Sequence, residues 1–383
     1  MRRFLIFVFC ILVVGGGAML FVRYVKTPPV VYRNASLSEE NLSSAIDRGI
    51  LFLEKQQNPD GGFSLYICDN AEPERCDPID SGPNTAAVFL ALWPLRGEER
   101  VDRMAQKGIA YIVGAVEANV RSPGFSHAVW NVFSPDDIRH GRIPSDIDGL
   151  SVASLALKKF GVSFSDDETV LLQFRNSGGL FYNWLSHEWN RSETDRHAFA
   201  GGDPNQFPDP NYYGVDCVVN ADVLAYFSAK GKQPEEICSY LNDVIERELY
   251  PQCTFYYRSP YILFTSMIAA AVDEGASCLE PSLPKIKRTL LEGVREDGTW
   301  SQNFFSNVVA TFTLVKLEER GAIVSSAVEH ILKMQRGDGG WDNAVVFPDL
   351  YNPVFYGSRE IVTATALRTL FEYKEYVLEG KER

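Results

Sequence analysis

After about residue 40, apolar positions recur with helical spacing in about twelve segments, and these segments alternate between two kinds. The amphipathic, charged segments are Asn41–Gln57, Val101–Ala118, Asp166–Arg175, Pro234–Leu249, Leu283–Arg295 and Ala322–Gln335. The segments that are apolar nearly all round are Asn84–Leu95, Asp146–Phe160, Asp216–Lys230, Pro260–Val272, Asn303–Glu318 and Arg359–Phe371. All-round apolar helices belong inside a protein and amphipathic ones on its rim. The pattern therefore predicts an all-α fold of six outer–inner helix pairs, an (α/α)6 toroid without sustained strands.

One unit occurs near both ends of the chain. Ala45–Leu65 and Ala327–Asn343 each read as an amphipathic helix ending in Gln, then a Gly-Gly turn, then an aromatic residue. A weaker copy, Ile286–Trp300, keeps the helix, the Asp-Gly turn and the Trp. One such unit cannot bury its apolar face alone, so the sequence indicates a fold built by repetition.

These units resemble the QW-type repeats of squalene–hopene cyclases and the related toroids of terpenoid cyclases and protein prenyltransferase β-subunits. The similarity of pattern covers roughly Asn41–Tyr376, and the first and last units match best. The resemblance implies a single toroid over residues 40–378, whereas the cyclases enclose their substrate between two helical domains. It does not imply one reaction, because a scaffold of this kind hosts many chemistries.

The second apolar segment opens with PSDIDGLSVA, which looks like the Asp-x-Asp-Asp-Thr-Ala motif with which class II terpene cyclases protonate an alkene or epoxide. By position, Asp146 matches the first Asp and Asp148 the second, which is the general acid. Gly149 and Leu150 replace the third Asp and the Thr. The resemblance thus implies that Asp148 is catalytic and that Asp146 tunes it, since burial and a nearby like charge keep a carboxyl protonated. The alternative is that Asp146 only caps its helix, a role that Asp commonly fills.

A second polar set, Asp216, Asn220 and Asp222, lies on the third apolar segment. Asp216 and Asn220 are four residues apart and share a helix face, so they either bond to neighbouring helices or bind substrate in a cavity. Aromatic residues in or near the long loops, including Trp184, Tyr213 and Tyr261, are further candidates for substrate binding or for ordinary loop packing.

Metal and cofactor sites are not predicted. Prenyltransferase β-subunits hold zinc through an Asp-x-Cys and a distant His, but here Asp216 is directly followed by Cys217, and the last apolar segment has no His. The five His do not pair at metal spacing, and no P-loop, GxSxG, GxGxxG or HExxH motif occurs.

The N-terminus predicts a membrane anchor. Phe4–Val22 is a run of 19 uncharged residues, close to the length of a bilayer-spanning helix. Residues 1–26 are therefore predicted to be a signal anchor, with a cleaved signal peptide as the alternative, and residues 27–39 a linker. The Arg pair before the run places the N-terminus in the cytoplasm and the toroid outside it.

Six cysteines follow the apolar run, and an even count suits an oxidising compartment. Cys68 and Cys76 flank a polar loop and form the favoured disulfide. Cys217 and Cys278 lie among apolar residues, where small buried thiols are the alternative.

The net charge of the body limits the classes of partner that the protein can bind. Residues 1–33 hold five basic residues and no acid, which leaves 32 basic and 50 acidic residues in the body and a net charge of −18. Such a body does not suit nucleic acid, whose binding depends on neutralising phosphates. Three functions remain: an isoprenoid- or lipid-processing enzyme with Asp148 as acid, a toroid that acts on or binds envelope glycans, and a non-catalytic toroid that binds a lipid or protein. The expected partners are accordingly a hydrophobic small molecule or an envelope glycan, with the membrane contacted through the N-terminal helix.

Overall fold

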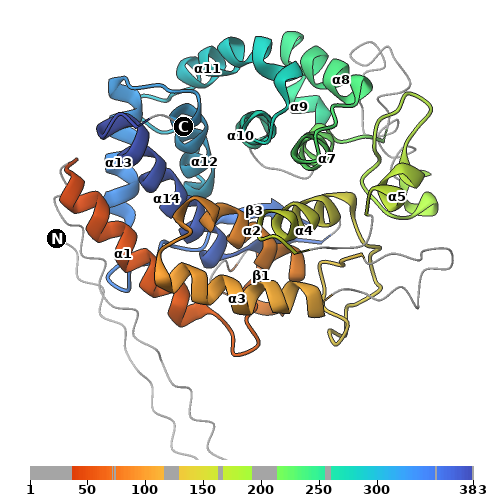
Figure 1. Cartoon of the computed structure of the whole chain (residues 1–383), viewed down its shortest axis with the longest axis horizontal. Coiled ribbons are helices and arrows are strands. Elements are labelled where there is room, and N and C mark those ends of the chain that lie inside the picture. The colour runs from red at the N-terminus through yellow and green to blue at the C-terminus, as the bar shows by residue number, and fades with distance from the viewer. Residues whose placement is uncertain are drawn as a thin grey trace, which may run out of the picture.

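The computed structural model describes residues 37–70, 72, 75–115, 129–162, 167–191, 214–254, 260–349 and 352–381. Six inner helices form a ring in which each packs against the next and the last packs against the first (Figure 1). They are α2 (Gly82–Leu92), α4 (Ile147–Lys159), α7 (Cys217–Ala229), α10 (Pro260–Asp273), α12 (Phe304–Lys316) and α14 (Arg359–Glu372). The predicted toroid of outer–inner pairs is confirmed.

The outer helices surround this ring. They are α1 (Glu39–Gln56), α3 (Glu99–Gly114), α5 (Asp167–Leu171), α8 (Glu235–Glu246), α11 (Leu283–Glu292) and α13 (Ala322–Met334). Shorter helical pieces are Trp93–Leu95, Leu172–Phe174, α9 (Tyr250–Cys253), Ser277–Ser282 and Tyr373–Leu378. The expected third outer helix, Asp166–Arg175, is cut to five α-helical residues followed by a 3₁₀ turn.

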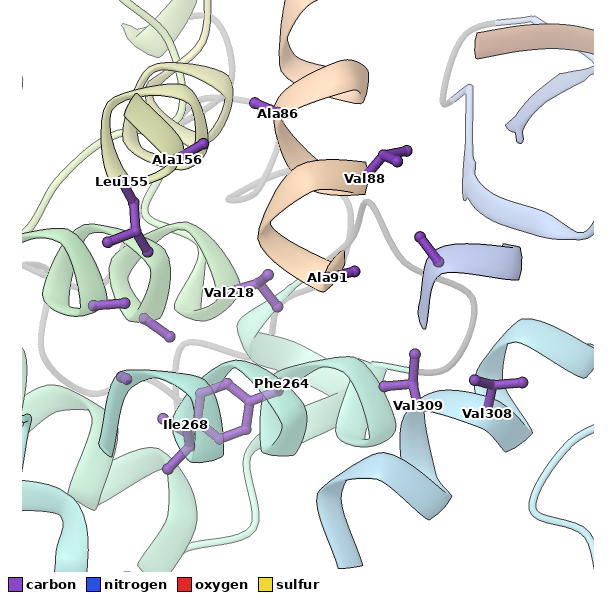
Figure 2. Close-up of a cluster of buried hydrophobic side chains, with 14 of the residues drawn as sticks. Ala86, Val88, Ala91, Leu155, Ala156, Val218, Phe264, Ile268, Val308 and Val309 are labelled. Carbon is purple, nitrogen blue, oxygen red and sulfur yellow. The ribbon is translucent and has the colours of Figure 1, made fainter. Parts of the chain in front are cut away.

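Small and aliphatic residues fill the spaces between neighbouring inner helices (Figure 2). Ala86 of α2 and Ala156 of α4 are fully buried where these helices pack, and Phe264 of α10 and Val308 of α12 are fully buried further round the ring. One contiguous apolar core runs through all of the inner helices, which explains why their sequences are apolar on nearly every side.

The repeated units share one hydrogen-bonding scheme. In the first unit the Gln57 side-chain amide donates to Gly61 O (2.9 Å) and to Met104 O of α3 (2.9 Å). In the last unit the Gln335 amide donates to Gly339 O (2.8 Å) and to Ala45 O of α1 (2.8 Å). Each Gln therefore joins its own turn to the next outer helix, and the last one closes the ring onto α1.

The turns also reveal a copy of the unit that the sequence pattern did not single out. In the first unit the Asn58 amide donates to Gly62 O and the Gly61 amide to Asn58 O, and the same two bonds recur in the segment after α5. There Asn176 pairs with Leu180 and Gly179 takes a positive φ of 83°. The structure thus contains four such turns among its described residues, the other two being at Arg295–Thr299 and Arg336–Gly340.

The expectation of a strand-free fold is wrong in one place. A four-stranded antiparallel sheet, in the order β2–β1–β4–β3, is built from the loops of the first and last pairs. Its strands are β1 (Ser64–Asp69), β2 (Cys76–Asp80), β3 (Val345–Pro348) and β4 (Val354–Gly357). Closure of the ring brings β1 beside β4, residues almost 300 positions apart, and that long-range pairing leaves no local periodicity to detect.

Three disulfides link the six body cysteines. Cys68 is paired with Cys76 across the β1–β2 hairpin. The other bridges are Cys217–Cys253, between α7 and α9, and Cys238–Cys278, between α8 and the turn before α11. The alternative of free buried thiols at Cys217 and Cys278 is therefore wrong. Three disulfides favour an oxidising compartment.

Within the described part of the chain, no helix has the length and apolarity needed to cross a bilayer. The predicted anchor and most of the linker lie outside the described residues.

Candidate active site

The first predicted acid, Asp146, is the N-cap of α4. Its carboxylate accepts a hydrogen bond from the Gly149 amide. That amide is one of the first-turn N–H groups that have no partner within the helix itself. Burial and the nearby Asp148 carboxyl raise the pKa of Asp146 to about 7, against the lowering effect of the Gly149 N–H. Asp146 is thus both a helix cap and a weak acid near neutral pH.

Gly149 explains why the third acid of the motif is missing. A Cβ atom at this position would lie 2.7 Å from Asp146 Oδ1 and 3.0 Å from Pro83 Cγ of α2. The close approach of α2 to the first turn of α4 therefore leaves no room for a carboxylate at 149.

The structure supplies another carboxyl group from the neighbouring helix. Asp222, in the second turn of α7, is hydrogen-bonded through its side chain to Asp148 in the first turn of α4. Burial, followed by the charge of Asp148 and that of Asp216, raises the pKa of Asp222 well above its ordinary value. Two carboxyl groups in hydrogen-bond contact hold a proton between them, because two carboxylates at that separation repel.

Both members of this carboxyl pair belong to the inward faces of their helices. On α4 the residues at helical spacing from Asp148, namely Val152 and Lys159, are also partly exposed, and on α7 Ala229 repeats the phase of Asp222. Since outer helices and neighbouring inner helices cover the other sides, these stripes face the centre of the ring. Many of the other inward positions near the pair are apolar: Pro83, Ala87 and Leu90 on α2, Leu263, Met267 and Ala270 on α10, and Ile361 on α14, one turn before the polar Thr365.

At the opposite end of the ring the inward side chains are ion-paired. Lys316 lies 2.8 Å from Asp273 and 3.2 Å from Glu372, and Arg368 lies 3.3 Å and 2.9 Å from the same two carboxylates. Lys159 of α4 similarly meets Glu274 at the end of α10 (2.6 Å). These three cations and three anions balance one another. Eleven residues separate Asp148 from Lys159, which corresponds to about 16 Å along the helix.

Asp216 caps α7 in the way that Asp146 caps α4. Its Oδ1 accepts from the Val218 amide (2.7 Å) and the Val219 amide (3.4 Å), and the residue is fully buried. Burial raises the pKa of Asp216 to about 7, although Thr254 and the two amides act in the opposite direction. Asp216 therefore adds another protonatable carboxyl beside the pair.

Asn220 does not reach the ring centre. Its Oδ1 accepts from the Phe181 amide (2.9 Å) and its Nδ2 donates to Phe181 O (2.9 Å) and Asp216 O (2.9 Å). Asn307 of α12, two helix pairs further on, likewise accepts from the Trp300 amide (3.0 Å). Asn220 is therefore an anchor of the repeat fold.

Of the three aromatic candidates, only Trp184 lies beside the acidic residues in the described structure. Trp184 is mostly buried, forms a backbone bridge with Asp146 and contacts Trp189 edge to face, with 5.5 Å between ring centroids. Tyr261 points away from the ring centre, because its hydroxyl lies beside Gly293 at the end of outer helix α11. Tyr213 lies outside the described residues.

An open pocket of about 410 Å³ adjoins this region, lined by Tyr182, His187, Asn190 and Arg191. Among the residues that the structure describes, no group of three or more His, Cys, Asp or Glu side chains is placed to hold a metal ion.

The raised pKa of Asp216 predicts a pH-dependent stability. Between the unfolded value of 3.8 and the folded value of about 7, the native state binds a proton that the unfolded chain has lost, so the free energy of unfolding falls as pH rises. Asp216→Asn removes this effect and still caps the helix. We expect the variant and the wild type to have the same melting temperature near pH 4. The variant should melt about 2 °C or more above the wild type at pH 8, and this difference should stop growing above pH 7. A difference that does not change with pH would show that Asp216 is ionised throughout.

Several solved structures with similar folds are of one enzyme, a type II terpene cyclase. The type II terpene cyclase MstE from Scytonema superposes with a TM-score of 0.63 at 16% identity, over 88% of this chain and 99% of that one. A variant of that cyclase has been solved in complex with geranylgeranyl dihydroxybenzoate, its substrate. A possible GH105-family member from Klebsiella pneumoniae superposes with a TM-score of 0.53 at 11% identity, over 91% of this chain and 98% of that one.

These similarities show a terpenoid-cyclase-like toroid fold. Because the MstE chain is matched over almost its full length, a cyclase can consist of one toroid of this size. The expectation that a cyclase needs two helical domains is therefore corrected. No protein-family model and no curated protein matches this sequence.

Proposed function

We propose that this protein is an acid catalyst that protonates an isoprenoid and so starts its cyclisation, with the Asp148–Asp222 pair as the proton donor. The observation that carries the proposal is the hydrogen bond between these two carboxyl groups on the inward faces of adjacent inner helices. Asp222 of α7 thus provides the further carboxyl group for which position 149 has no room. The fold of a terpene cyclase supports the same class of substrate.

The geometry suits protonation of carbon. The shared proton leaves the pair and bonds to one carbon of the terminal double bond, or to an epoxide oxygen whose C–O bond breaks. The two carboxylates that remain repel each other, so the pair readily takes up a new proton. The next double bond attacks the tertiary cation, and loss of a proton from a later carbon ends the reaction, so that an alkene is isomerised without change in composition. Apolar inward residues keep water away from the cation, and Asp146 and Asp216 are placed beside the pair to return its proton.

A glycosidase role receives less support. Hydrolysis of a glycosidic bond uses two carboxyl groups about 5–9.5 Å apart, one on each side of that bond. Asp148 and Asp222 are in hydrogen-bond contact, which leaves no space for a sugar linkage between them. The open pocket beside Arg191 would suit a polar group, but it presents no pair of carboxylates among its described lining residues.

We further propose that the toroid is held outside the cytoplasm by the N-terminal apolar run. The three disulfides support an oxidising location, and the uncharged 19-residue segment supports anchoring. Thiol labelling of denatured, unreduced protein from the native host should then modify at most one of the seven cysteines. Labelling of all seven would overturn the location.

Cyclisation by protonation can be tested with a deuterium label. The purified full chain is incubated in D₂O with linear isoprenoids of ~C15–C30. This range brackets the distance of about 16 Å along α4 from Asp148 to Lys159. A cyclic product should appear that carries one deuterium at the former terminal alkene, as measured by gas chromatography–mass spectrometry. Product that forms without deuterium would exclude the acid pair as initiator.

A further inference from the structure

A short extended segment joins the two helix ends that carry the acids. Tyr182 forms a backbone bridge with Val215, and Trp184 forms one with Asp146. Between them, Asn183 O accepts a hydrogen bond from the Ile147 amide (2.8 Å). Asn183 therefore lies between the caps of α7 and α4, at the end of the ring where Asp148 and Asp222 meet.

The side chain of Asn183 is buried, and no described residue forms a hydrogen bond with it. Only 3% of the residue is exposed, and among the described residues neither its Oδ1 nor its Nδ2 has a partner. A buried amide without partners costs about 1–3 kcal/mol. Two nearby asparagines have partners. The Asn190 side chain accepts from the Trp184 amide (3.0 Å) and donates to Trp184 O (2.7 Å), and Asn220 makes the same two bonds with Phe181.

The direction of this side chain follows from the extended backbone. Alternate residues of such a segment point to the same side, so Asn183 shares the side of Phe181. The Phe181 ring packs on Phe227 of α7, with 6.0 Å between centroids, whereas Tyr182 lines the open pocket on the other side. The Asn183 amide is therefore directed toward the inner helices.

A second set of buried polar side chains lies at the start of α7. Burial raises the pKa of Asp216, and a hydrogen bond from the Thr254 side chain to its carboxyl acts in the opposite direction. Thr254 directly follows Cys253, whose disulfide to Cys217 holds it at the start of α7. The buried polar side chains at the ends of α4 and α7 therefore include one hydrogen-bonded pair, Thr254 and Asp216, and the Asn183 amide, which no described residue meets.

We propose that Asn183 binds an oxygen atom on the reacting end of the ligand, so that the preferred substrate is an isoprenoid with a terminal epoxide or hydroxyl group rather than a bare alkene. This inference rests on the proposed function. The Asn183 N–H donates to the ligand oxygen, and its carbonyl can accept from a ligand hydroxyl. With an epoxide, the amide holds the oxygen while the acid pair transfers its proton to it, the C–O bond breaks, and a hydroxyl group and a carbocation result.

The test compares two substrates that differ only in that oxygen: geranylgeranyl acetate and its terminal epoxide. For the wild type we expect a higher kcat/KM with the epoxide. Asn183→Leu should lower the epoxide-to-alkene ratio of kcat/KM by about 10- to 100-fold, because the ligand oxygen loses its partner. Asn183→Ser, which keeps a hydrogen-bonding group, should recover part of that ratio.

Stability separates recognition from a structural role. Replacing an unpaired buried amide by an apolar side chain of similar size is neutral or stabilising, so Asn183→Leu should melt at or above the wild-type temperature. Asn220→Leu is the control and should melt lower, since it leaves Phe181 without its partners. In addition, the terminal alcohol of the same chain should raise the melting temperature of the wild type more than that of Asn183→Leu, which would identify a hydroxyl as the group bound.

The outcomes distinguish the two proposals. An unchanged substrate ratio together with a melting temperature lowered as in Asn220→Leu would overturn the inference and leave the acid pair in place. Wild-type protein that converts neither substrate and is not stabilised by the alcohol would overturn both. Turnover of both substrates that is lost in Asp148→Asn, with a ratio that depends on Asn183, supports both.

Discussion

Asp148→Asn and Asp222→Asn should each reduce cyclisation by at least about 10²–10⁴-fold, the usual contribution of a general acid. In either variant the amide can keep a hydrogen bond to the remaining carboxylate, but the proton held between two carboxyl groups is gone. Because the two residues act as a unit, the double variant should be little worse than either single variant. Initial rates of product formation under saturating substrate provide the measurement.

The controls for this result are thermal stability and an acid outside the site. Both variants should fold, since Asn replaces Asp without a change in size, and removal of a carboxyl from a buried pair relieves repulsion. Asp338→Asn, which loses only the surface ion pair with Arg359, should retain wild-type turnover. Full activity in Asp148→Asn would remove the proposed function. Loss in Asp148→Asn with full activity in Asp222→Asn would show that Asp148 acts without its partner.

The inner helices could be predicted closely because their signals are local. The apolar segments at Asp146–Phe160 and Asp216–Lys230 correspond to α4 and α7, and each begins at an Asp that is the N-cap in the structure. Apolar residues on all sides and a capping side chain at the start are both properties of the helix itself. The sheet has no such signal, since β1 and β4 become neighbours only through closure of the ring.

The site could be predicted only in part for a related reason. The motif indicates Asp148, but the four-residue spacing of Asp216 and Asn220 points to a different face of α7 from the one that holds its partner. At about 100° per residue, Asp222 lies roughly 160° from Asn220 around the helix, so a site on the Asn220 face excludes it. Which face of α7 meets α4 is decided by the packing of the ring. Asn220 instead meets Phe181, in a copy of the repeat that the sequence pattern did not single out.

Asn183 had no sequence signal at all. It lies in a long loop among aromatic residues, and its significance depends on burial without a hydrogen-bond partner among the described residues. Such a property depends on every neighbouring group at once, so it can be read only from a three-dimensional structure.

The second large effect is expected at the point where the ring closes. Gly339 has a φ of 97°, and a Cβ atom there would overlap Arg48 O of α1. Gly339→Ala should therefore lower the free energy of unfolding by at least about 2 kcal/mol, since a left-handed Ala is strained and the backbone of α1 has to shift. This corresponds to a drop of about 4 °C or more in the melting temperature, measured by calorimetry or circular dichroism.

Gly337→Ala is the matched control. It lies in the same turn but has no atom within 4 Å of the added Cβ, so it should change the melting temperature by less than about 1 °C. Equal effects of the two substitutions would mean that contact between the last turn and α1 does not hold the ring closed. A large effect at Gly339 alone is the expected result, to which both the left-handed backbone and the contact with α1 contribute.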